Sequence, residues 1–430
     1  MALIRNNAKV SARIAVELQK LNFQEENAQE TSIYKFSSNN STSDSQQVTV
    51  IGGANLDYIF KLVDESTIGL KGVTQPCEFT TTLGGVARNM TEALFRLGMK
   101  NTILISAVGN DLSGRHICEE SQKLGMNVSK LHKLNQANVI TGTYCAVFHA
   151  SGEINLALGN MKAHDFITPE LIQRNLETLS QSNFCVLDAD IPSETIEFVC
   201  SYCQSQNIPV WFNPTDLRKC YKLIEANSLT KITYISPNLK ELFAIFSLTW
   251  QSDKNLNPKE RAEMERINLS YKESVNRLEE FKFDDLKRVL KYLLKFVPFI
   301  LLTRGGDDLI LASAYELDEN KTNQLPSKER MDLLKKMKKQ SQLLLYPTLK
   351  LNKNESISNV SGAGDSCSGG IISGILRNFS LNSIIYNGLA SAKFTLMSDK
   401  TVSEKLDQIN LNYVETLVKE NEFKVKKIIL

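Results

Sequence analysis

Short apolar runs alternate with amphipathic stretches along much of the 430-residue chain, and their spacing predicts strands followed by helices. The clearest series lies in the middle of the chain. Its expected elements are a strand at 184–188, a helix at 193–206, a strand at 209–213, a helix at 216–226, a strand at 232–235 and a helix at 238–247. Strands that alternate with helices indicate a parallel sheet covered by helices on both faces.

Further strands are expected on both sides of this series. Buried apolar segments occur at 48–53, 102–108 and 299–303. Residues 141–158 alternate between apolar and polar positions around a Ser-Gly pair, which is typical of a β-hairpin.

Two polar segments interrupt the pattern. Residues 251–295 are long, charged and helical, and residues 317–342 are polar and rich in lysine. We expect the first to be a surface insertion and the second a mobile loop. Charged faces are usually only solvated, so neither segment indicates a binding function.

The first 46 residues differ from the rest. Residues 1–22 are expected to form an amphipathic helix, and residues 23–46 have so few apolar side chains that we expect a disordered linker. No acidic residue precedes Glu17, so a mitochondrial presequence is one interpretation of the helix.

Charge and composition exclude several classes of protein. The 50 basic and 48 acidic residues nearly balance, which gives no reason to expect binding to nucleic acid or to a membrane surface. No apolar run reaches the ~18 residues that cross a bilayer. We expect a cytoplasmic protein whose cysteines are reduced thiols, with a mitochondrial location as the alternative.

The strongest chemical signal is a run of small residues before a predicted helix. Gly362, Ala363 and Gly364 leave backbone N–H groups free to bind an anion, with the helix dipole adding partial positive charge. Asp365 follows them, and it would repel a phosphate unless its role is to take a proton from a hydroxyl group. The alternative is an ordinary helix N-cap.

The longer string Asn359-Val-Ser-Gly-Ala-Gly-Asp365, with Gly-Gly one turn later, resembles the C-terminal signature of the ribokinase-like (PfkB) carbohydrate kinases. The resemblance implies an α/β ribokinase-like fold, with a mostly parallel central sheet, helices on both faces and a small β-sheet lid. It also implies transfer of the γ-phosphoryl group of ATP to a primary hydroxyl, with Asp365 as the general base. Mg²⁺ would bridge the phosphates, and a monovalent cation such as K⁺ is a further cofactor the family allows.

The same resemblance implies a set of residues that bind the sugar. Asn55 and Asp57 lie at alternating positions, so their side chains point to the same side of an extended segment, although a turn explains them equally well by chemistry alone. In the family, the matching residues grip the substrate. Gly84, Gly85 and Asn89 belong to a second signature, Thr80 to Gly98, and would contact the same sugar.

The nucleotide site is implied by weaker motifs. Asn238 and Glu241 match the family's Asn-x-x-Glu, in which the glutamate organises Mg²⁺ through water; by itself this spacing is common at helix starts. Thr303 and Gly305 match part of a phosphate-binding loop, but Asp308 stands where a glycine is expected. On a helix expected at 382–396, Asn387 would border the adenine.

The region from Thr141 to Met161 looks most like the lid of pseudouridine kinases, which implies the 5′-hydroxyl of pseudouridine as the acceptor. Ribose or another nucleoside is the alternative substrate, and a non-catalytic binding protein is the alternative class.

Residues 1–22 resemble the last helix of pseudouridine-5′-phosphate glycosidases, and a remnant of such an enzyme is the second interpretation of this N-terminal helix. Residues 47–430 would form the kinase domain, with lid strands near 75–83 and 141–160 and a homodimer through the lid left open.

Overall fold

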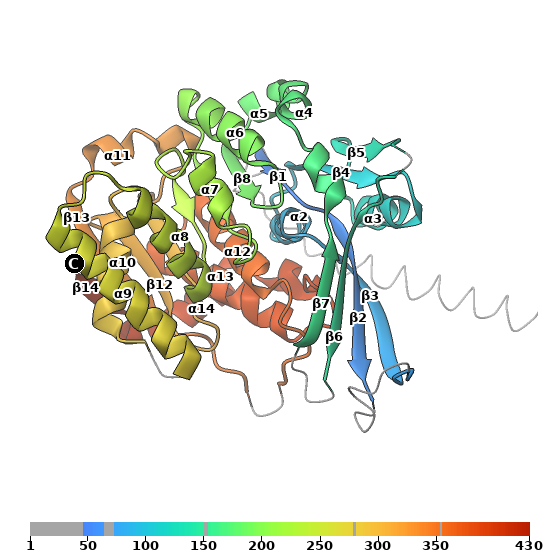
Figure 1. Cartoon of the computed structure of the whole chain (residues 1–430). Coiled ribbons are helices and arrows are strands. Elements are labelled where there is room, and N and C mark those ends of the chain that lie inside the picture. The colour runs from blue at the N-terminus through green and yellow to red at the C-terminus, as the bar shows by residue number, and fades with distance from the viewer. Residues whose placement is uncertain (1–45, 64–72, 137, 150–153, 278–280, 353–354) are drawn as a thin grey trace, which may run out of the picture. The chain divides into compact units, whose positions relative to one another are not determined.

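The structure is a computed structural model in which residues 46–63, 73–136, 138–149, 154–277, 281–352 and 355–430 are described (Figure 1). Its strands are β1 (Val48–Ile51), β2 (Asn55–Leu62), β3 (Cys77–Gly84), β4 (Thr102–Gly109), β5 (Leu131–Leu134), β6 (Gly142–Phe148), β7 (Ile154–Asn160), β8 (Phe184–Asp188), β9 (Val210–Asn213), β10 (Tyr234–Ile235), β11 (Phe299–Leu302), β12 (Leu309–Tyr315), β13 (Lys339–Tyr346) and β14 (Lys426–Ile429).

The α-helices of the described residues are α2 (Val86–Arg96), α3 (Leu112–Lys123), α4 (Pro169–Gln173), α5 (Leu176–Ser180), α6 (Ser193–Ser205), α7 (Tyr221–Glu225), α8 (Leu239–Ser252), α9 (Pro258–Arg277), α10 (Phe283–Leu293), α11 (Leu333–Lys336), α12 (Ala363–Leu376), α13 (Leu381–Leu396) and α14 (Leu411–Asn421). A 3₁₀ helix, η1 (Lys162–Phe166), follows β7.

A large sheet organises the fold. Among the described residues its strand order is β14-β13-β12-β11-β10-β9-β8-β1-β4-β5. The strands from β11 to β5 pair in parallel, whereas β12, β13 and β14 extend the sheet with antiparallel pairs. The predicted α/β fold with a mostly parallel sheet is therefore confirmed.

The apolar core lies in two layers, one on each face of this sheet. Because side chains alternate along a strand, Val48 and Val50 of β1 face one layer while Ile51 faces the other. Helices α2, α12 and α13 cover the Val50 face, and helices α6, α8 and α10 cover the Ile51 face (Figure 1). Apolar burial on both faces explains why the central strands are almost continuously hydrophobic.

A second, smaller sheet stands apart from the large one, with strand order β3-β2-β6-β7 (Figure 1). β2 pairs in parallel with β6, and the outer pairs β2–β3 and β6–β7 are antiparallel. This is the small sheet that the resemblance implied. β2 belongs to it as well, so Asn55 and Asp57 lie on the lid itself.

The segment after β9 differs from its prediction. A helix was expected at 216–226, but α7 begins only at Tyr221. Thr215 has a φ of 67°, and the Asp216 side chain accepts the N–H of Arg218 at 2.7 Å. These local bonds form a turn that competes with helix formation, and the turn brings Asp216 and Lys219 to the edge of the sheet.

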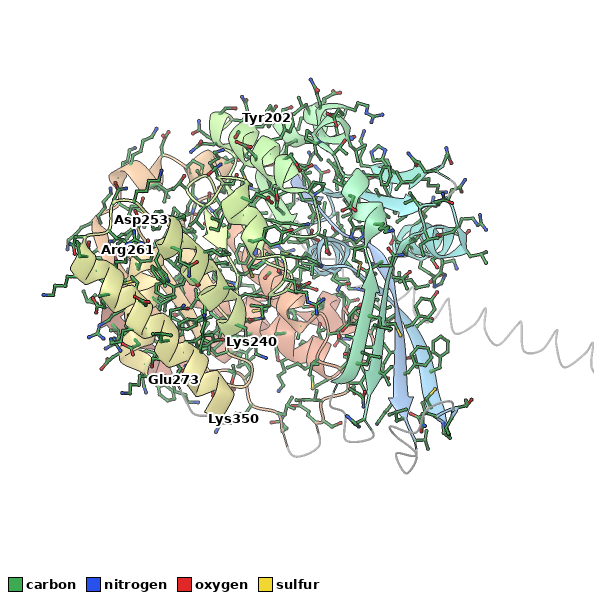
Figure 2. The ribbon with its side chains drawn as sticks, in the orientation of Figure 1. Tyr202, Lys240, Asp253, Arg261, Glu273 and Lys350 are labelled. Carbon is green, nitrogen blue, oxygen red and sulfur yellow. The ribbon has the colours of Figure 1, made fainter. Side chains whose placement is uncertain are left out.

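Both polar segments pack against the rest of the fold. In 251–295, the Tyr271 ring of α9 stacks on Phe243 at 3.7 Å between centroids, and Arg261 donates to the carbonyl of Asp253 (Figure 2). In 317–342, which we expected to be mobile, Leu317 and Leu325 are buried.

Residues 1–45 lie outside the described residues, and so do the predicted N-terminal helix and all of the predicted linker except Gln46, which is buried. The described helices include none that is both long enough and apolar enough to cross a bilayer.

Candidate active site

The predicted site residues meet where the parallel strands end. The carboxyl ends of β1, β8, β9, β10 and β11 share one edge of the large sheet, which is where ligands bind in open α/β folds. Helices α2 and α12 start close to this edge and pack tightly on each other. A side chain on Gly369 of α12 would meet Cβ of Ala93 in α2 at 2.9 Å.

Asp365 lies in the first turn of α12 and is only 8% exposed. The side-chain amide of Asn89, on α2, donates to its Oδ2 at 3.0 Å. Burial raises the pKa of Asp365 to about 7; the Asn89 hydrogen bond lowers it, and the carboxylates of Glu241 and Asp190 raise it. A carboxyl group with that pKa can accept and release a proton near neutral pH.

The backbone before Asp365 has the shape of an anion site. Gly362 has a φ of 78°, and a Cβ there would lie 1.8 Å from the carbonyl oxygen of Thr401, so only glycine fits. Nothing lies within 4 Å of a Cβ built on Gly364, so that side of the loop is open. The first amides of α12, including those of Ala363 and Gly364, have no acceptor within the helix and can bind an anion.

The predicted sugar-binding residues converge on the small sheet. The amide of Asn55 donates to Oδ1 of Asp57, and burial raises the pKa of Asp57 to about 7, against the lowering effects of that bond and of Arg88. The carboxylate lies against Gly84, where a Cβ would come within 2.3 Å of it. Gly85 has a φ of 93° and would clash with the carbonyl of Gly53 if it carried a side chain.

The sequence did not predict two groups of residues that connect the elements around the predicted site. Asp188, at the end of β8, accepts N–H groups from Gly53 at 2.8 Å and from Ala87 at 3.0 Å. It therefore ties the end of β1 to the start of α2. His164, on η1, is fully buried and contacts the backbone of Ala54 through Nε2 at 3.1 Å.

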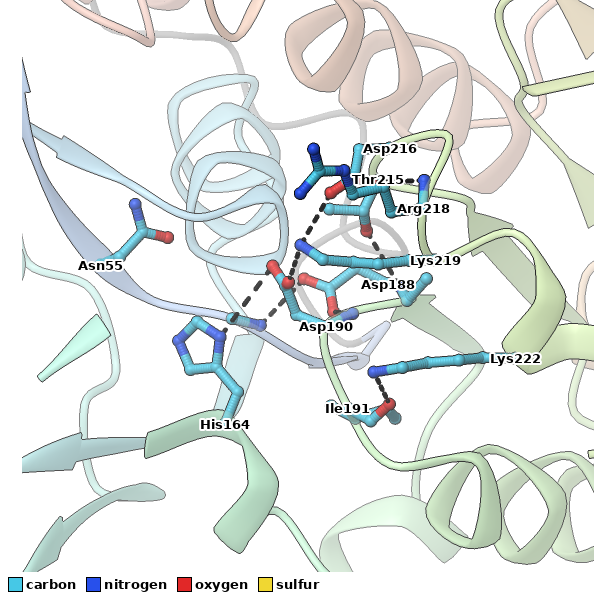
Figure 3. A network of polar contacts seen from close by, with 12 residues as sticks. Asn55, His164, Asp188, Asp190, Ile191, Thr215, Asp216, Arg218, Lys219 and Lys222 are labelled. Carbon is cyan, nitrogen blue, oxygen red and sulfur yellow. Dashed lines mark hydrogen bonds and ion pairs between the residues drawn. The ribbon is translucent and has the colours of Figure 1, made fainter. Parts of the chain in front are cut away.

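A second missed group is an ion cluster beside Asp188 and His164, in which only Asp190 is buried (Figure 3). Lys219 lies between the carboxylates of Asp190 and Asp216, with the Asp216 contact at 3.0 Å. Burial would raise the pKa of Asp190, but electrostatic interactions with His164 and Lys219 outweigh it and hold the pKa below its usual value. The acidic residues at the end of the 184–188 strand were a visible signal for Asp190; Lys219 had none.

On the nucleotide side, two predicted pairs come together. Asn238 and Glu241 form a capping box: the Asn238 N–H donates to Glu241 at 2.9 Å, and the Glu241 N–H donates to Asn238 at 3.0 Å. Thr303 is paired with Asn238 in an isolated β-bridge. A Cβ built on Gly305 would meet nothing within 4 Å, so the loop is open there. Asp308 stands where the family motif has a glycine.

Asn387 is the last residue predicted for the nucleotide site, and its place beside the adenine stays a prediction. It lies within α13 and is 3% exposed, and its amide donates to the carbonyl of Gly370 at 2.6 Å. That bond joins α13 to α12, so the structure gives Asn387 a packing role.

Comparisons with known proteins decide the family. The profile of the "pfkB family carbohydrate kinase" matches residues 45–267, just over half of the chain. The chain belongs to the pfkB family.

Relatives and solved structures agree with a pfkB kinase. A pseudouridine kinase of Arabidopsis thaliana is 27% identical over 381 residues, which is 84% of this chain and 94% of the relative. A pseudouridine-metabolizing bifunctional protein of Schizosaccharomyces pombe is 23% identical and matches 85% of this chain, but only 48% of its own length. A ribokinase of Arabidopsis thaliana solved with ribose and ATP has the same fold, with a TM-score of 0.59 at 16% identity, over 87% of this chain and 99% of that one.

Membership in the pfkB family and these relatives support an ATP-dependent kinase for a sugar or a nucleoside. The predicted site residues include groups that such a reaction can use: a carboxyl group with a pKa of about 7, free amides at a helix start and polar side chains that can hold hydroxyl groups. The polar side chains are buried, whereas the amides at the start of α12 lie on the open side of the loop.

Proposed function

We propose that this pfkB kinase phosphorylates the 5′-hydroxyl of pseudouridine with ATP. The observation that carries the proposal is the buried Asn89–Asp365 pair at the start of α12, which provides a base of suitable pKa beside an anion site. The choice of nucleoside is supported by the two curated relatives, both named for pseudouridine, and by the lid residues 141–161.

The reaction follows from the positions of these groups. Asn55 and Asp57 hold the ribose hydroxyls, and Asp365 takes the proton of the 5′-hydroxyl. The oxygen then bonds to the γ-phosphorus while the bond to the β-phosphate oxygen breaks, leaving ADP. The amides of Ala363 and Gly364 stabilise the charge on the transferred phosphoryl group.

The donor set fits Mg²⁺ bound through phosphates and water. Within the described residues, no three His, Cys, Asp or Glu side chains come together as a metal site. Mg²⁺ usually keeps several waters and binds proteins through few carboxylates. Glu241 would hold such a water, since Asn238 occupies only its Oε2. When bound, the ion would neutralise charge on the phosphates; a monovalent cation remains a prediction.

The choice between nucleosides should depend on the nucleobase rather than on the ribose. Pseudouridine has a free N1–H, whereas uridine uses N1 for its glycosidic bond. A buried acceptor for that N–H would be left unpaired by uridine, at a cost of ~1–3 kcal/mol or more. Tyr144 of β6 pairs in register with Asp57, so we place the nucleobase beside Tyr144.

A competition assay tests the proposal. Pseudouridine and uridine at equal concentration, with ATP and Mg²⁺, should give almost only the pseudouridine product, because a site built for one N–H can discriminate by about 10⁴. Equal phosphorylation of both would refute the substrate. ATP consumption that is the same with and without any acceptor would favour a binding protein instead.

Ribose is the second candidate, because a solved neighbour of the same fold is a ribokinase bound to ribose and ATP. Asn55, Asp57 and Asn89 would contact only the sugar, so they suit free ribose as well. A higher kcat/KM for ribose than for pseudouridine in the same assay would decide for it.

We also propose that two copies pair through the small sheet. Phe79, Phe60, Val147 and Leu156 form one row across its strands, and Leu158 lies two residues along on the same face. Phe79 and Leu158 are more than half exposed. Sedimentation should show a dimer that Leu158→Glu converts to a monomer; a wild-type monomer at micromolar concentration would exclude it.

A further inference from the structure

Arg88 is a buried cation next to the proposed base. It precedes Asn89 on α2 and is 2% exposed. Its Nη1 donates to the side-chain oxygen of Asn89 at 3.0 Å and to the carbonyl of Leu83 at 3.2 Å, and its Nη2 pairs with Glu92. A buried guanidinium is costly unless it is paired, so these contacts of Nη1 and Nη2 determine where its charge can lie, while Nε is buried without a hydrogen-bond partner.

We propose that Arg88 is a positioning residue that fixes the orientation of the Asn89 side-chain amide and, through it, the hydrogen bond to the base Asp365. This inference rests on the proposed function, since it assigns a part in phosphoryl transfer to a residue that does not touch the substrate.

The argument starts from the two ends of an asparagine amide. Its oxygen can only accept hydrogen bonds and its nitrogen can only donate them, whereas a guanidinium can only donate. Arg88 must therefore face Oδ1 of Asn89, which turns Nδ2 toward Oδ2 of Asp365. Nδ2 carries two hydrogens, so the second one is available to a hydroxyl oxygen of the substrate.

Without Arg88, the opposite orientation would no longer be excluded. A rotated amide would place Oδ1 against the Asp365 carboxylate, where two acceptors repel each other. The base would then lose the hydrogen bond that stabilises its charged form, and the substrate would meet an acceptor in place of a donor.

Arg88 is itself held from several sides. Glu92 also pairs with Arg96 at 2.7 Å, and the carbonyl of Leu83 accepts a second hydrogen bond, from the Thr401 hydroxyl. Thr401 contacts the anion-site loop at Gly362. The network therefore joins α2, the end of β3 and the loop before α12, and it orients Asn89 before any substrate binds.

The charged groups around Asp365 make its pKa sensitive to this orientation. Glu241 at the start of α8, Asp190 after β8 and Asp57 on β2 are carboxyl groups that interact electrostatically with it, and their charged forms raise its pKa. Asn89 opposes their effect by stabilising the charged form. Removing that donor should raise the pKa of Asp365, by about one unit.

The first test needs no turnover. In protein labelled with ¹⁵N-asparagine, the Nδ2 resonances of Asn89 should titrate with Asp365, and Asp365→Asn should abolish that titration. The midpoint should rise by about one pH unit in Arg88→Met. Arg96→Met is the matched control, because Arg96 shares Glu92 but does not contact Asn89; its midpoint should stay at the wild-type value.

Equal midpoints in all three proteins, or equal shifts in both arginine variants, would overturn the proposal. If Arg88→Met does not fold, Arg88→Lys replaces it: the charge is kept, the forked contact is lost, and a smaller rise is expected. An unchanged midpoint in Arg88→Lys would then overturn it.

The second test measures kinetics against pH. In Arg88→Met, kcat should fall about tenfold or more and its acid limb should move to higher pH. KM for ATP should stay within a few-fold, since Arg88 hydrogen-bonds to Leu83, Asn89 and Glu92 and not to the residues predicted to bind ATP. A change in KM for ATP alone would contradict a positioning role. If the wild type phosphorylates none of the nucleosides or sugars offered, the proposed function fails, whereas the titration still decides the role of Arg88.

Discussion

The side-chain amide of Asn89 donates to Oδ2 of Asp365 at 3.0 Å, although the two residues are 276 positions apart in the chain. Each belongs to the first turns of a helix, and the two helices, α2 and α12, pack against each other. The proposed base and one of the proposed sugar-binding residues therefore form one unit, so a change in either should affect both binding and proton transfer.

Replacing Asp365 tests the base directly. Asp365→Asn is nearly isosteric and removes the basic group, so kcat should fall by ~10²–10⁴ while the circular dichroism spectrum is unchanged. Asp332→Asn is the control, because the Asp332 side chain, at the N-cap of α11, is 76% exposed. Turnover in Asp365→Asn close to that of the wild type would reduce Asp365 to a helix cap.

The pH dependence of kcat should follow the ionisation of Asp365. Burial raises its pKa to about 7, and only the charged form can accept a proton. The rate should therefore rise as pH increases through about 7 and decline about tenfold per unit well below it. Initial rates in overlapping buffers from pH 5 to pH 9 would check this. A flat profile between pH 5.5 and 8 would mean that another group is the base.

The burial of Asp365 also predicts a change in the free energy of unfolding. Asp365→Asn should gain stability at high pH while it loses activity. The pKa of Asp365 is about 7 in the fold and 3.8 ordinarily, so the folded state binds more protons between those values, and stability falls as pH rises through that window. Asp365→Asn lacks this effect. It should be more stable than the wild type at pH 8, by at most about 4 kcal/mol, and equal below pH 4.

Urea unfolding at pH 4 and pH 8 measures this difference. A variant that is less stable than the wild type at pH 8 would show that the carboxylate is well compensated inside the fold.

Two glycines of the anion loop should respond differently to alanine. In Gly362→Ala, the new Cβ would lie 1.8 Å from the Thr401 oxygen in a left-handed conformation, so stability should fall by ~2 kcal/mol or more. In Gly364→Ala, the Cβ meets nothing, so Tm should hardly change while kcat falls because the methyl enters the phosphoryl space. Thermal unfolding and initial rates separate the two; equal Tm values would contradict the proposed loop geometry.

The lid should become more ordered when the nucleoside binds. β6 and β7 belong to the small sheet, whose outer face carries exposed apolar side chains. A substrate held between Asp57 and the large sheet would slow hydrogen exchange across β6 and β7. Exchange followed by mass spectrometry, with pseudouridine and with adenine alone, checks this. Equal rates with and without pseudouridine would mean that the lid does not close on it.

The regular part of the fold could be predicted from local pattern. β8, predicted at 184–188, is Phe184–Asp188, and α6, predicted at 193–206, is Ser193–Ser205, because apolar spacing there agrees with burial on both faces of the sheet. The helix predicted at 216–226 was too long, since the hydrogen bond from the Arg218 N–H to the Asp216 side chain outweighs a helical pattern.

The sequence by itself determined the family motifs, the parallel sheet and the candidate base Asp365, because these depend on residue types at short spacing. Only the tertiary structure decided that Asp188 ties β1 to α2, that Lys219 lies between Asp190 and Asp216, and that Arg88 faces Oδ1 of Asn89. The physical reason is that a hydrogen bond or an ion pair depends on distance in space. Residues far apart in the chain leave no periodic trace of the contacts they make.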